Sequence, residues 1–589
     1  MINSFSKSKI DSLLNQLQLN NLDGIIFSTN DEYINEYVPN YYKRLEYLTG
    51  FTGSRGLCIV LKNNAAVFVD GRYTLQATNQ INQDIFEIKD YTKKSIENWL
   101  KDNLNPNNKI GINLKTTTNQ EFSYFNDIVK NKESVLIEMK SNLVDDIWID
   151  RPTKVLNPIQ IYDKELAGED IKSKILKIVD LIKKNNLDYY FFTALDSISW
   201  LLNIRGSDVP NNPYNLGSLL VDNLGNITFF CNSKKITSET KELLGNYVVF
   251  FEEDNLENYF LLLKDKENKK IGISNQSPVY FSKLFISFSY RISILDDLVQ
   301  PLKAIKNSTE IYNITQAHIK DGVALTKLLY NIHSSPLEYD EISIEQKLQE
   351  IKKNLYPNDY VYDSFDYIIG VDEHGAIVHY RATEITNKKI TNNSIVLLDS
   401  GSQYKQGTTD VTRTISIENP TKEFKRNFTL VLKGLLALSN TVFPEGTTGG
   451  QLDVLARQFL WQHQLNYNHG TGHGVGNFLG VHEGPISLHS SSSVQLEAYN
   501  VLSIEPGVYL TNQYGIRLEN LYYIKEHSAG FLCFSPLTLV PFDGKNIDTD
   551  ILNDTEISFL NSYNSLLINS LSAFLTKEEL EWLKLYTRI

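Results

Sequence analysis

Histidines are concentrated in one part of the chain. Seven of the ten histidines in this 589-residue sequence fall between positions 374 and 489. Two of them, His469 and His473, stand in the stretch NHGTGHGVG, whose glycines leave backbone room for a ligand and permit unusual dihedral angles. A lone histidine is usually a satisfied core or surface residue. Two in a glycine-rich stretch favour a role in binding or catalysis.

A first pair of carboxylates lies on a segment with the pattern of a β-hairpin. The apolar run from Ile395 to Leu398 ends at Asp399, residues 401–407 predict a turn, and the returning strand 408–417 carries Asp410. A carboxylate that ends or interrupts an apolar strand is costly to bury alone. Such a residue needs a cation or several hydrogen-bond donors.

A second pair lies on a similar segment beyond the histidines. Residues 502–509 carry Glu505, the chain is expected to reverse near residues 512–515, and the returning strand carries Glu519. The two-residue period of a strand places Arg517 and Glu519 on one face. Each hairpin therefore offers two carboxylates from neighbouring strands.

A structural explanation exists for each carboxylate taken singly. Asp399 can start a turn and Asp410 can be a solvated strand residue. Glu505 can lie in a loop, and Glu519 can pair with Arg517. Four converging carboxylates would repel one another, however, and two divalent cations would remove that repulsion.

The chemistry of these side chains indicates the kind of metal. Four carboxylates and one imidazole, without thiolates, suit manganese, iron, cobalt or a catalytic zinc better than a structural zinc. Neither an HExxH helix nor a GxxxxGK[ST] phosphate-binding loop occurs, so the sequence lacks the main signatures of zincins and nucleotide-binding proteins.

Composition excludes several classes of partner. The formal charge of −13 and the pI near 5.4 argue against nucleic acid and anionic membranes, which need a basic surface. Three dispersed cysteines do not suggest a disulfide framework. With no apolar run of signal-peptide or membrane-spanning length, we expect a cytoplasmic protein.

An internal repeat predicts the elements that precede this region. Residues 8–23 and 173–188 both begin with Ser-Lys-Ile, continue with helical apolar spacing and end in Asn-Asn-Leu-Asp, and an apolar run follows each. Two α/β domains of one plan would give this pattern, whereas coincidence in an Asn- and Lys-rich chain is the alternative. The repeats are offset by 165 residues at their starts.

We expect the chain to divide into three domains, at residues 1–152, 153–304 and 305–589. The second boundary is placed in residues 299–307, where Pro301 interrupts a polar linker. The third domain should begin with a helix over residues 314–332. It should end in a helical extension, since Thr576 and Glu579 form a capping box.

Four strings in the third domain, together with two in the first domains, resemble a known family. The strings are GAIVHY (375–380), DSGSQYKQGTTDVTRT (399–414), HGTGHGVGNFLGVHEGP (469–485), SIEPGVYLTNQYGIRLEN (503–520), DGRY (70–73) and NIRGSDV (203–209). They resemble the cytosolic aminopeptidase P, or Xaa-Pro aminopeptidase, family, within the wider group of prolidase, creatinase and methionine aminopeptidase. The resemblance covers nearly the whole chain. It implies α/β and α+β architecture, with two similar creatinase-like N-terminal domains followed by a pita-bread catalytic domain.

The resemblance also implies a dinuclear manganese site, with two ions per subunit and cobalt or zinc as alternatives. Its ligands match Asp399, Asp410, His473, Glu505 and Glu519. By analogy, Asp410 and Glu519 bridge the ions, Asp399 binds one ion, and His473 and Glu505 bind the other.

Further roles follow from the same analogy. His379 matches a proton-shuttling histidine and His482 one that contacts the peptide, while Glu505 is expected to take a proton from the attacking water. The residues that match peptide-binding positions are Arg72, His379, His469, His482, Tyr509 and Arg517. One departure is Arg381-Ala382, where the family pattern has a small residue and proline.

The implied reaction is removal of an N-terminal residue when proline is second, by attack of a metal-activated water. A prolidase-like dipeptidase is the nearest alternative, and a noncatalytic pita-bread binding module is an alternative of another class. The expected partners are peptides with proline in second position and, by the family alone, a second copy in a homodimer. Nucleic acid and membranes are not expected.

Overall fold

Two six-stranded sheets of the same plan form the first part of the chain in the computed structural model, which describes residues 2–263 and 266–589. In each sheet the first strand along the chain lies centrally, antiparallel to the second strand and parallel to the fifth. In each sheet the fourth strand along the chain is parallel to the third, and the sixth is parallel to the fifth. The predicted duplication is therefore confirmed, and the alternative of coincidence is wrong.

The first sheet has the order β4 (Glu87–Asp90), β3 (Ala65–Val69), β2 (Gly56–Leu61), β1 (Gly24–Ser28), β5 (Lys109–Asn113) and β6 (Val135–Met139). Its helices are α1 (Ile2–Leu19), α2 (Arg44–Thr49), α3 (Thr74–Gln80), α4 (Lys93–Asn103), α5 (Asn119–Asn131) and α6 (Leu143–Ile147).

The second sheet has the order β12 (Val248–Glu252), β11 (Ile227–Cys231), β10 (Ser218–Asp222), β8 (Tyr189–Phe192), β13 (Lys270–Ser274) and β14 (Arg291–Leu295). Its helices are α8 (Ile171–Lys184), α9 (Leu195–Leu201), α10 (Ser238–Leu244), α11 (Leu256–Leu262) and α12 (Val279–Ser287), and β7 (Gln160–Ile161) pairs with β9 (Ile204–Arg205).

The repeated Asn-Asn-Leu-Asp string makes the same turn in both copies. Asn21 and Asn186 adopt left-handed backbone conformations, with φ of 54° and 53°, which asparagine tolerates better than most residues. The aspartates that follow pair through their backbone amides with the fifth strand of their own sheet. The string thus turns the chain from the first helix into the central strand.

The chain separates into two compact units. The first contains residues 1–163 and 169–299, and the second contains residues 164–168 and 300–589. Pro301 does not lie in an irregular linker as predicted, because α13 (Gln300–Ala304) includes it. Proline is tolerated in the first turn of a helix, where its missing N–H is not needed.

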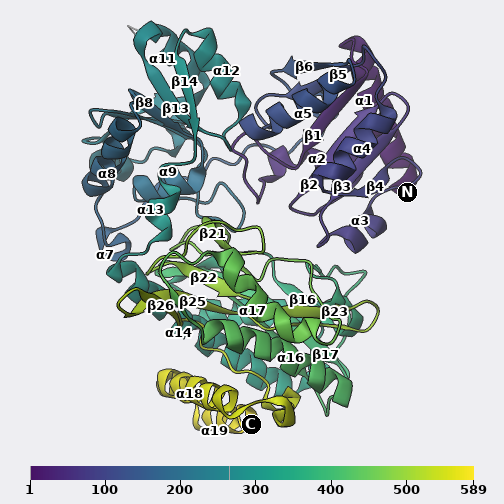
Figure 1. The fold of residues 1–589 in the computed structure, drawn as a ribbon, viewed down its shortest axis with the longest axis vertical. Helices are drawn as coiled ribbons and strands as arrows, with labels where there is room; N and C mark the ends of the chain where they lie inside the picture. The colour runs from purple at the N-terminus through teal and green to yellow at the C-terminus, as the bar shows by residue number, and fades with distance from the viewer. Residues whose placement is uncertain (1, 264–265) are drawn as a thin grey trace. The chain divides into compact units, whose positions relative to one another are not determined.

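The second unit contains two sheets, a short two-stranded ribbon and several helices (Figure 1). One sheet contains β15 (Tyr360–Asp363), β17 (Ile395–Tyr404), β16 (Ile368–Val371) and β18 (Gly407–Ser416). The other contains β19 (Val442–Pro444), β26 (Phe531–Pro536), β25 (Asn520–Ser528), β22 (Val501–Ile504), β20 (Gly472–Gly474) and β21 (Glu483–Leu488), and the ribbon is β23 (Gly507–Leu510) with β24 (Tyr514–Arg517).

The helices that pack on these strands include α14 (Ser308–Ser334), α15 (Glu341–Leu355), α16 (Lys422–Ser439) and α17 (Gly449–Trp461). Three more pack on other helices: α7 (Lys164–Ala167), α18 (Asp554–Leu571) and α19 (Lys577–Tyr586). The predicted helix over residues 314–332 lies within α14, and the capping box of Thr576 and Glu579 starts α19 as predicted. The C-terminal helices, yellow in Figure 1, pack on α14 and α16.

The first predicted hairpin exists, but its turn is shorter than expected. β17 runs through Gly401 to Tyr404, and Lys405 and Gln406 alone make the turn. Gly401 is needed inside the strand, because a Cβ there would lie 2.2 Å from Ser364 Oγ. The prediction that residues 401–407 form the turn is therefore wrong.

The second predicted hairpin is broken in both arms. β22 pairs with β25 and β23 with β24, so Glu505-Pro506 and Leu518-Glu519 face one another between the two ladders. Pro506 cannot donate to a ladder, which accounts for the interruption. Two of the predicted metal ligands thus lie where strands leave one sheet for another. Within the described residues, no helix has the length and hydropathy needed to cross a membrane.

Candidate metal centre

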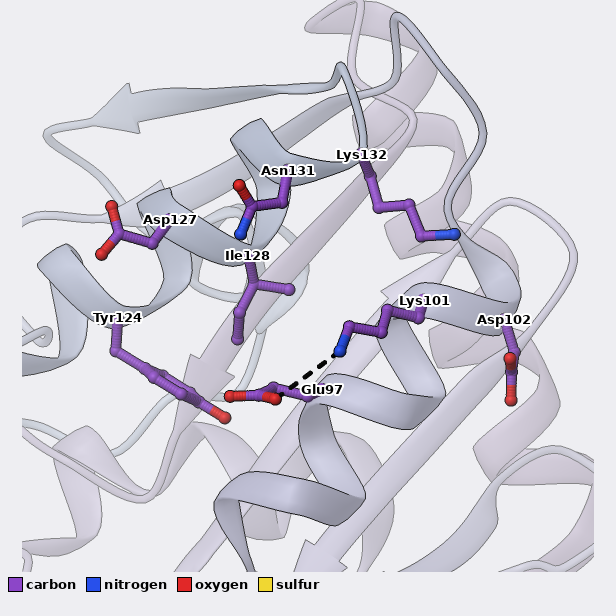
Figure 2. A pocket seen from close by; sticks show the side chains of 8 residues that line it. All are labelled: Glu97, Lys101, Asp102, Tyr124, Asp127, Ile128, Asn131 and Lys132. Atoms are coloured by element: carbon purple, nitrogen blue, oxygen red, sulfur yellow. Dashed lines mark ion pairs between the residues drawn. The ribbon is translucent and has the colours of Figure 1, made fainter.

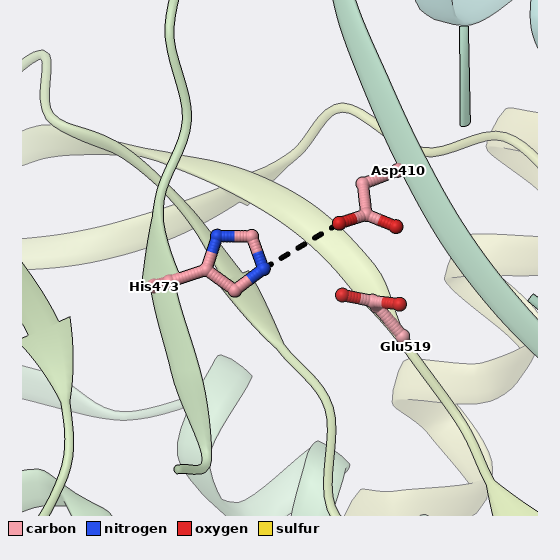
Figure 3. A group of neighbouring side chains, drawn as sticks. All are labelled: Asp410, His473 and Glu519. Atoms are coloured by element: carbon pink, nitrogen blue, oxygen red, sulfur yellow. Dashed lines mark ion pairs between the residues drawn. The ribbon is translucent and has the colours of Figure 1, made fainter. Parts of the chain in front are cut away.

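Three predicted ligands meet in the second unit. Asp410 comes from β18, His473 from β20 and Glu519 from the break between β24 and β25, and their ligand atoms lie within 4.8 Å of one another. Figure 3 shows the imidazole and the two carboxylates turned toward a common point. Strands that are distant from one another in the sequence therefore bring these three ligands together.

His473 presents one ring nitrogen to the carboxylates. Its Nε2 lies 3.4 Å from Asp410 Oδ2 and 3.6 Å from Glu505 Oε1. Its Nδ1 lies 3.0 Å from the carbonyl oxygen of Gly474, to which it can donate, and this leaves Nε2 as a ligand atom. Burial alone would lower the pKa of His473, but the hydrogen bond to Asp410 and the charge of Glu505 raise it to about 9.

Asp399 is bound on one side only. Its Oδ2 accepts a hydrogen bond of 2.6 Å from Arg517 Nη2, while its Oδ1 is buried without a hydrogen-bond partner among the described residues. Oδ1 of Asp410 is likewise buried without a hydrogen-bond partner among the described residues. Buried carboxylate oxygens normally have partners, so these two atoms suit the coordination of cations.

Burial and mutual repulsion disfavour the charged forms of these acids. Burial raises the pKa of Asp399 to about 7, with the charge of Asp410 adding to the shift and Arg517 opposing it. Burial, followed by repulsion from Asp410, raises the pKa of Glu519 well above its ordinary value. Burial also raises the pKa of Glu505. Divalent cations would stabilise the charged forms, so the residues present fit a metal centre.

A chain of hydrogen bonds joins three of the predicted peptide-binding residues. His469 Nε2 lies 2.8 Å from the Tyr509 hydroxyl, and Arg517 Nη1 donates to the same hydroxyl at 2.8 Å. Tyr509 and Arg517 stand on the paired strands β23 and β24. Arg517 therefore connects this group to Asp399.

His482 and His379 lie on two other segments. The exposed His482 precedes β21, and its ring centroid is 4.4 Å from that of His473 in an edge-to-face arrangement. His379 lies in the turn that follows the short helix of residues 372–376. The next residue, Tyr380, shares a small apolar cluster with Leu397, and Tyr509 packs against this cluster. The helix of residues 372–376 contacts β23 and β24, so this segment lies beside the ribbon.

The departure at Arg381 is accommodated by an ion pair. Its Nη1 and Nη2 bind the two carboxylate oxygens of Glu345 on α15 at 2.8 and 3.0 Å. A bidentate pair of this kind restricts the loop in place of the proline expected there. The sequence alone did not indicate Glu345 as its partner.

Glu341 is a second residue that the sequence analysis missed. Its buried carboxylate accepts hydrogen bonds from the backbone N–H groups of Val371 and Lys388, from the Tyr380 hydroxyl at 2.9 Å and from His374 Nδ1 at 2.7 Å. In the sequence it looks like an exposed residue of an amphipathic helix. Only its contacts reveal that it holds both ends of the segment that carries His379.

Arg72 lies in the first unit, where its guanidinium pairs with Asp70 at 2.6 Å. Its role in peptide binding stays a prediction. A hollow of about 420 Å³ also lies in this unit, between α4 and α5 (Figure 2). Side chains of both charge signs line it, including the pair Glu97 and Lys101. It contains none of the predicted site residues.

Four segments of the chain match known protein families. Residues 312–526 match metallopeptidase family M24, and residues 530–589 match the C-terminal region of peptidase M24. Residues 9–142 and 150–310 each match a creatinase/prolidase N-terminal domain.

Similar proteins match along nearly the whole chain. A Pyricularia oryzae protein named Probable Xaa-Pro aminopeptidase P is 33% identical, with 99% of each chain covered. A Caenorhabditis elegans protein named Xaa-Pro aminopeptidase is 34% identical over 95% of this chain and 94% of that one. The chain therefore belongs to metallopeptidase family M24, and it carries two creatinase-type N-terminal domains before the pita-bread domain.

A solved structure agrees with the fold over the full length. The X-prolyl aminopeptidase of Caenorhabditis elegans, described as a cytosolic enzyme with a di-nuclear active site, superimposes with a TM-score of 0.94. It is 32% identical, with 99% of both chains covered.

Proposed function

We propose that this protein is a metal-dependent aminopeptidase that hydrolyses the bond between an N-terminal residue and a proline in second position. The convergence of Asp410, His473 and Glu519, with buried carboxylate oxygens that have no hydrogen-bond partner among the described residues, carries the proposal. The relatives named Xaa-Pro aminopeptidase support the substrate class.

Two manganese ions per subunit are the proposed cofactors, with cobalt or zinc as alternatives. Carboxylates and one imidazole suit these metals. We assign Asp410 and Glu519 as bridging ligands, Asp399 to one ion, and His473 and Glu505 to the other. Two features support this assignment: Nε2 of His473 faces Asp410 and Glu505, and the buried Oδ1 atoms of Asp399 and Asp410 have no hydrogen-bond partner within the described part of the chain.

Protein side chains supply the proton chemistry in this proposal. A divalent pair provides Lewis acidity and lowers the pKa of a water molecule toward neutrality. Glu505, within 3.6 Å of His473, accepts the proton from the nucleophile. His379 donates a hydrogen bond to the developing negative charge and supplies the proton that the departing proline nitrogen needs, while His482 binds the peptide.

Selectivity for proline follows from the absence of an N–H on its amide nitrogen. We propose that His469, Tyr509 and Arg517 form the walls around the proline ring, supported by the hydrogen bonds that hold them together. Another second residue would bring an N–H without a necessary partner. An unpaired buried donor costs about 1–3 kcal/mol, or roughly tenfold to a hundredfold in kcat/KM.

Two alternatives remain distinguishable by experiment. A prolidase-like enzyme would use the same ligands but would accept only dipeptides. A noncatalytic binding module would not need the five metal-binding side chains that the second unit carries. We also propose a homodimer in the cytoplasm, which the description of the Caenorhabditis elegans enzyme as cytosolic supports for location.

The test compares four peptides after the protein is chelated and reloaded with single metals. Arg-Pro-Pro should be cleaved after Arg, Arg-Ala-Pro should be nearly inert, and N-acetylated Arg-Pro-Pro should fail because its amine is blocked. Preference for the dipeptide Arg-Pro would favour a prolidase. Equal kcat/KM for the proline and alanine peptides would contradict the proline pocket, and no turnover with any metal would contradict the enzyme.

A further inference from the structure

Arg413 is a fully satisfied cation buried beside the metal centre. It stands on β18, three residues after Asp410, and is 2% exposed. Within the described residues it pairs with no carboxylate; its charge is stabilised instead by carbonyl oxygens, one amide oxygen, a hydroxyl and the Phe542 ring, 4.1 Å from its guanidinium carbon. Such an arrangement is costly to desolvate and depends on the fork geometry of arginine.

One end of this guanidinium holds the backbone of Glu519. Nη1 of Arg413 donates to the carbonyl oxygen of Glu519 at 2.6 Å and to that of Thr412 at 2.8 Å. The N–H of Glu519 donates to the Thr412 carbonyl at 3.1 Å, and the Thr412 hydroxyl donates to the Glu519 carboxylate at 2.8 Å. Because Glu519 lies between two strands, these contacts replace the missing ladder.

The other end reaches the C-terminal segment. Nη2 donates to the carbonyl oxygen of Val540 at 2.7 Å, and Nε donates to that of Pro541 at 3.0 Å. Nη2 also lies 3.3 Å from the hydroxyl of Tyr563 on α18, and this hydroxyl donates to the Val540 carbonyl at 2.7 Å. The helix, the segment before it and Glu519 therefore share one cation.

We propose that Arg413 is a positioning residue through which the C-terminal segment, residues 538–563, sets the backbone of Glu519 and thereby the affinity of the metal centre. This inference rests on the proposed function, since it assumes that Glu519 binds metal. It gives the segment a role beyond covering the core: the Tyr563 hydroxyl and two backbone carbonyls keep the guanidinium in the orientation that Glu519 requires.

The experiment measures Mn²⁺ affinity directly in the full-length, metal-free protein, by competition with a chelator at a temperature well below unfolding. Tyr563→Phe removes only the hydroxyl, and Arg413→Lys keeps the charge but loses the fork. For Arg413→Lys we expect the Mn²⁺ affinity to fall about tenfold to a hundredfold, the range seen when groups supporting metal ligands are changed. For Tyr563→Phe, which removes a more distant group, we expect a fall of about threefold to tenfold. The melting temperature of each metal-free protein is recorded in parallel.

Leu567→Ala is the matched control. Leu567 is buried on the same helix, belongs to the apolar core and makes no hydrogen bond through its side chain. We expect this variant to lower the melting temperature at least as much as Tyr563→Phe but to keep Mn²⁺ affinity within twofold. Unchanged affinity in Tyr563→Phe and Arg413→Lys, or an affinity loss in Leu567→Ala that follows its stability, would overturn the positioning role. Absence of Mn²⁺ binding in the unmodified protein would instead contradict the proposed function.

Discussion

Nη2 of Arg517 donates a hydrogen bond of 2.6 Å to Asp399 Oδ2, while Nη1 of the same guanidinium donates to Tyr509 at 2.8 Å. One buried cation thus binds a proposed metal ligand and a proposed wall of the peptide site. The other oxygen of Asp399 has no hydrogen-bond partner in residues 2–263 and 266–589, and it suits a metal ion. The proposed metal site and the proposed peptide site are therefore connected through Arg517.

Arg517→Met should make the stability of the protein depend more strongly on bound metal. Removing one partner of a buried pair leaves an uncompensated charge and costs about 3–5 kcal/mol, and a cation at Asp399 would recover part of that loss. We expect a larger rise in melting temperature on adding Mn²⁺ than in the unmodified protein. Equal rises in both proteins would show that Asp399 does not bind the ion.

Asp410→Ala should abolish turnover and lower bound metal, because the proposed bridging ligand serves both ions. Elemental analysis of the purified variant gives the metal content, and Arg-Pro-Pro hydrolysis gives activity. Full metal content together with full turnover would contradict the five-ligand assignment.

His379→Ala should separate proton chemistry from metal binding. Loss of an acid–base group typically lowers turnover by about a hundredfold to ten-thousandfold, while the ligands stay in place. The measurements are kcat on Arg-Pro-Pro and metal content. A parallel fall in metal content would identify His379 as a ligand or a structural support instead.

Glu341→Gln should lower kcat without loss of metal. The glutamine replaces one carboxylate oxygen with an NH₂ group, which cannot accept hydrogen bonds. The donors that converge on that oxygen would lose their acceptor, so the segment that carries His379 should lose its position. We expect a fall of about tenfold or more, consistent with about 1.5–3 kcal/mol for hydrogen bonds to a charged group. The control is Glu350→Gln, at an exposed position of the same helix, which should have no effect. Equal behaviour of the two variants would refute the role of Glu341.

Acid should weaken the attachment of the C-terminal helices through His333. This ring lies 4.9 Å from that of Tyr586, and its Nε2 is buried without a hydrogen-bond partner among the described residues. Burial, with a smaller contribution from Lys545, lowers the pKa of His333 from 6.5 to about 4. The unfolded chain therefore binds the proton more tightly, and the stability is present above about pH 6.5 and lost as the pH falls toward 4.

The check on His333 is the change in melting temperature between pH 7 and pH 4.5. The full shift corresponds to roughly 3 kcal/mol at most, and partial exposure of the ring reduces it. His333→Phe, which has no proton to bind, should lose less stability over this interval than the unmodified protein. An identical loss in both proteins would place the acid sensitivity elsewhere.

Local signals in the sequence were sufficient for several features. The repeated Asn-Asn-Leu-Asp string predicted two domains of one plan, because a helix, a left-handed asparagine and a buried strand are each encoded over a few neighbouring residues. The capping box at Thr576 and the amphipathic spacing of α14 predicted helices for the same reason. The glycine-rich histidine stretch and the carboxylates on apolar strands indicated a metal site.

Only the tertiary structure decided how those residues meet. The turn after β17 and the breaks at Glu505 and Glu519 depend on which strands pair. The position of Glu519 depends further on contacts more than a hundred residues apart, such as its hydrogen bond with Thr412. Glu341 and Arg413 had no distinguishing pattern in the sequence, since a buried charge is recognised by its partners and not by its neighbours along the chain. Side-chain type and local periodicity are properties of short segments, whereas the convergence of donors on one atom is a property of the folded chain alone.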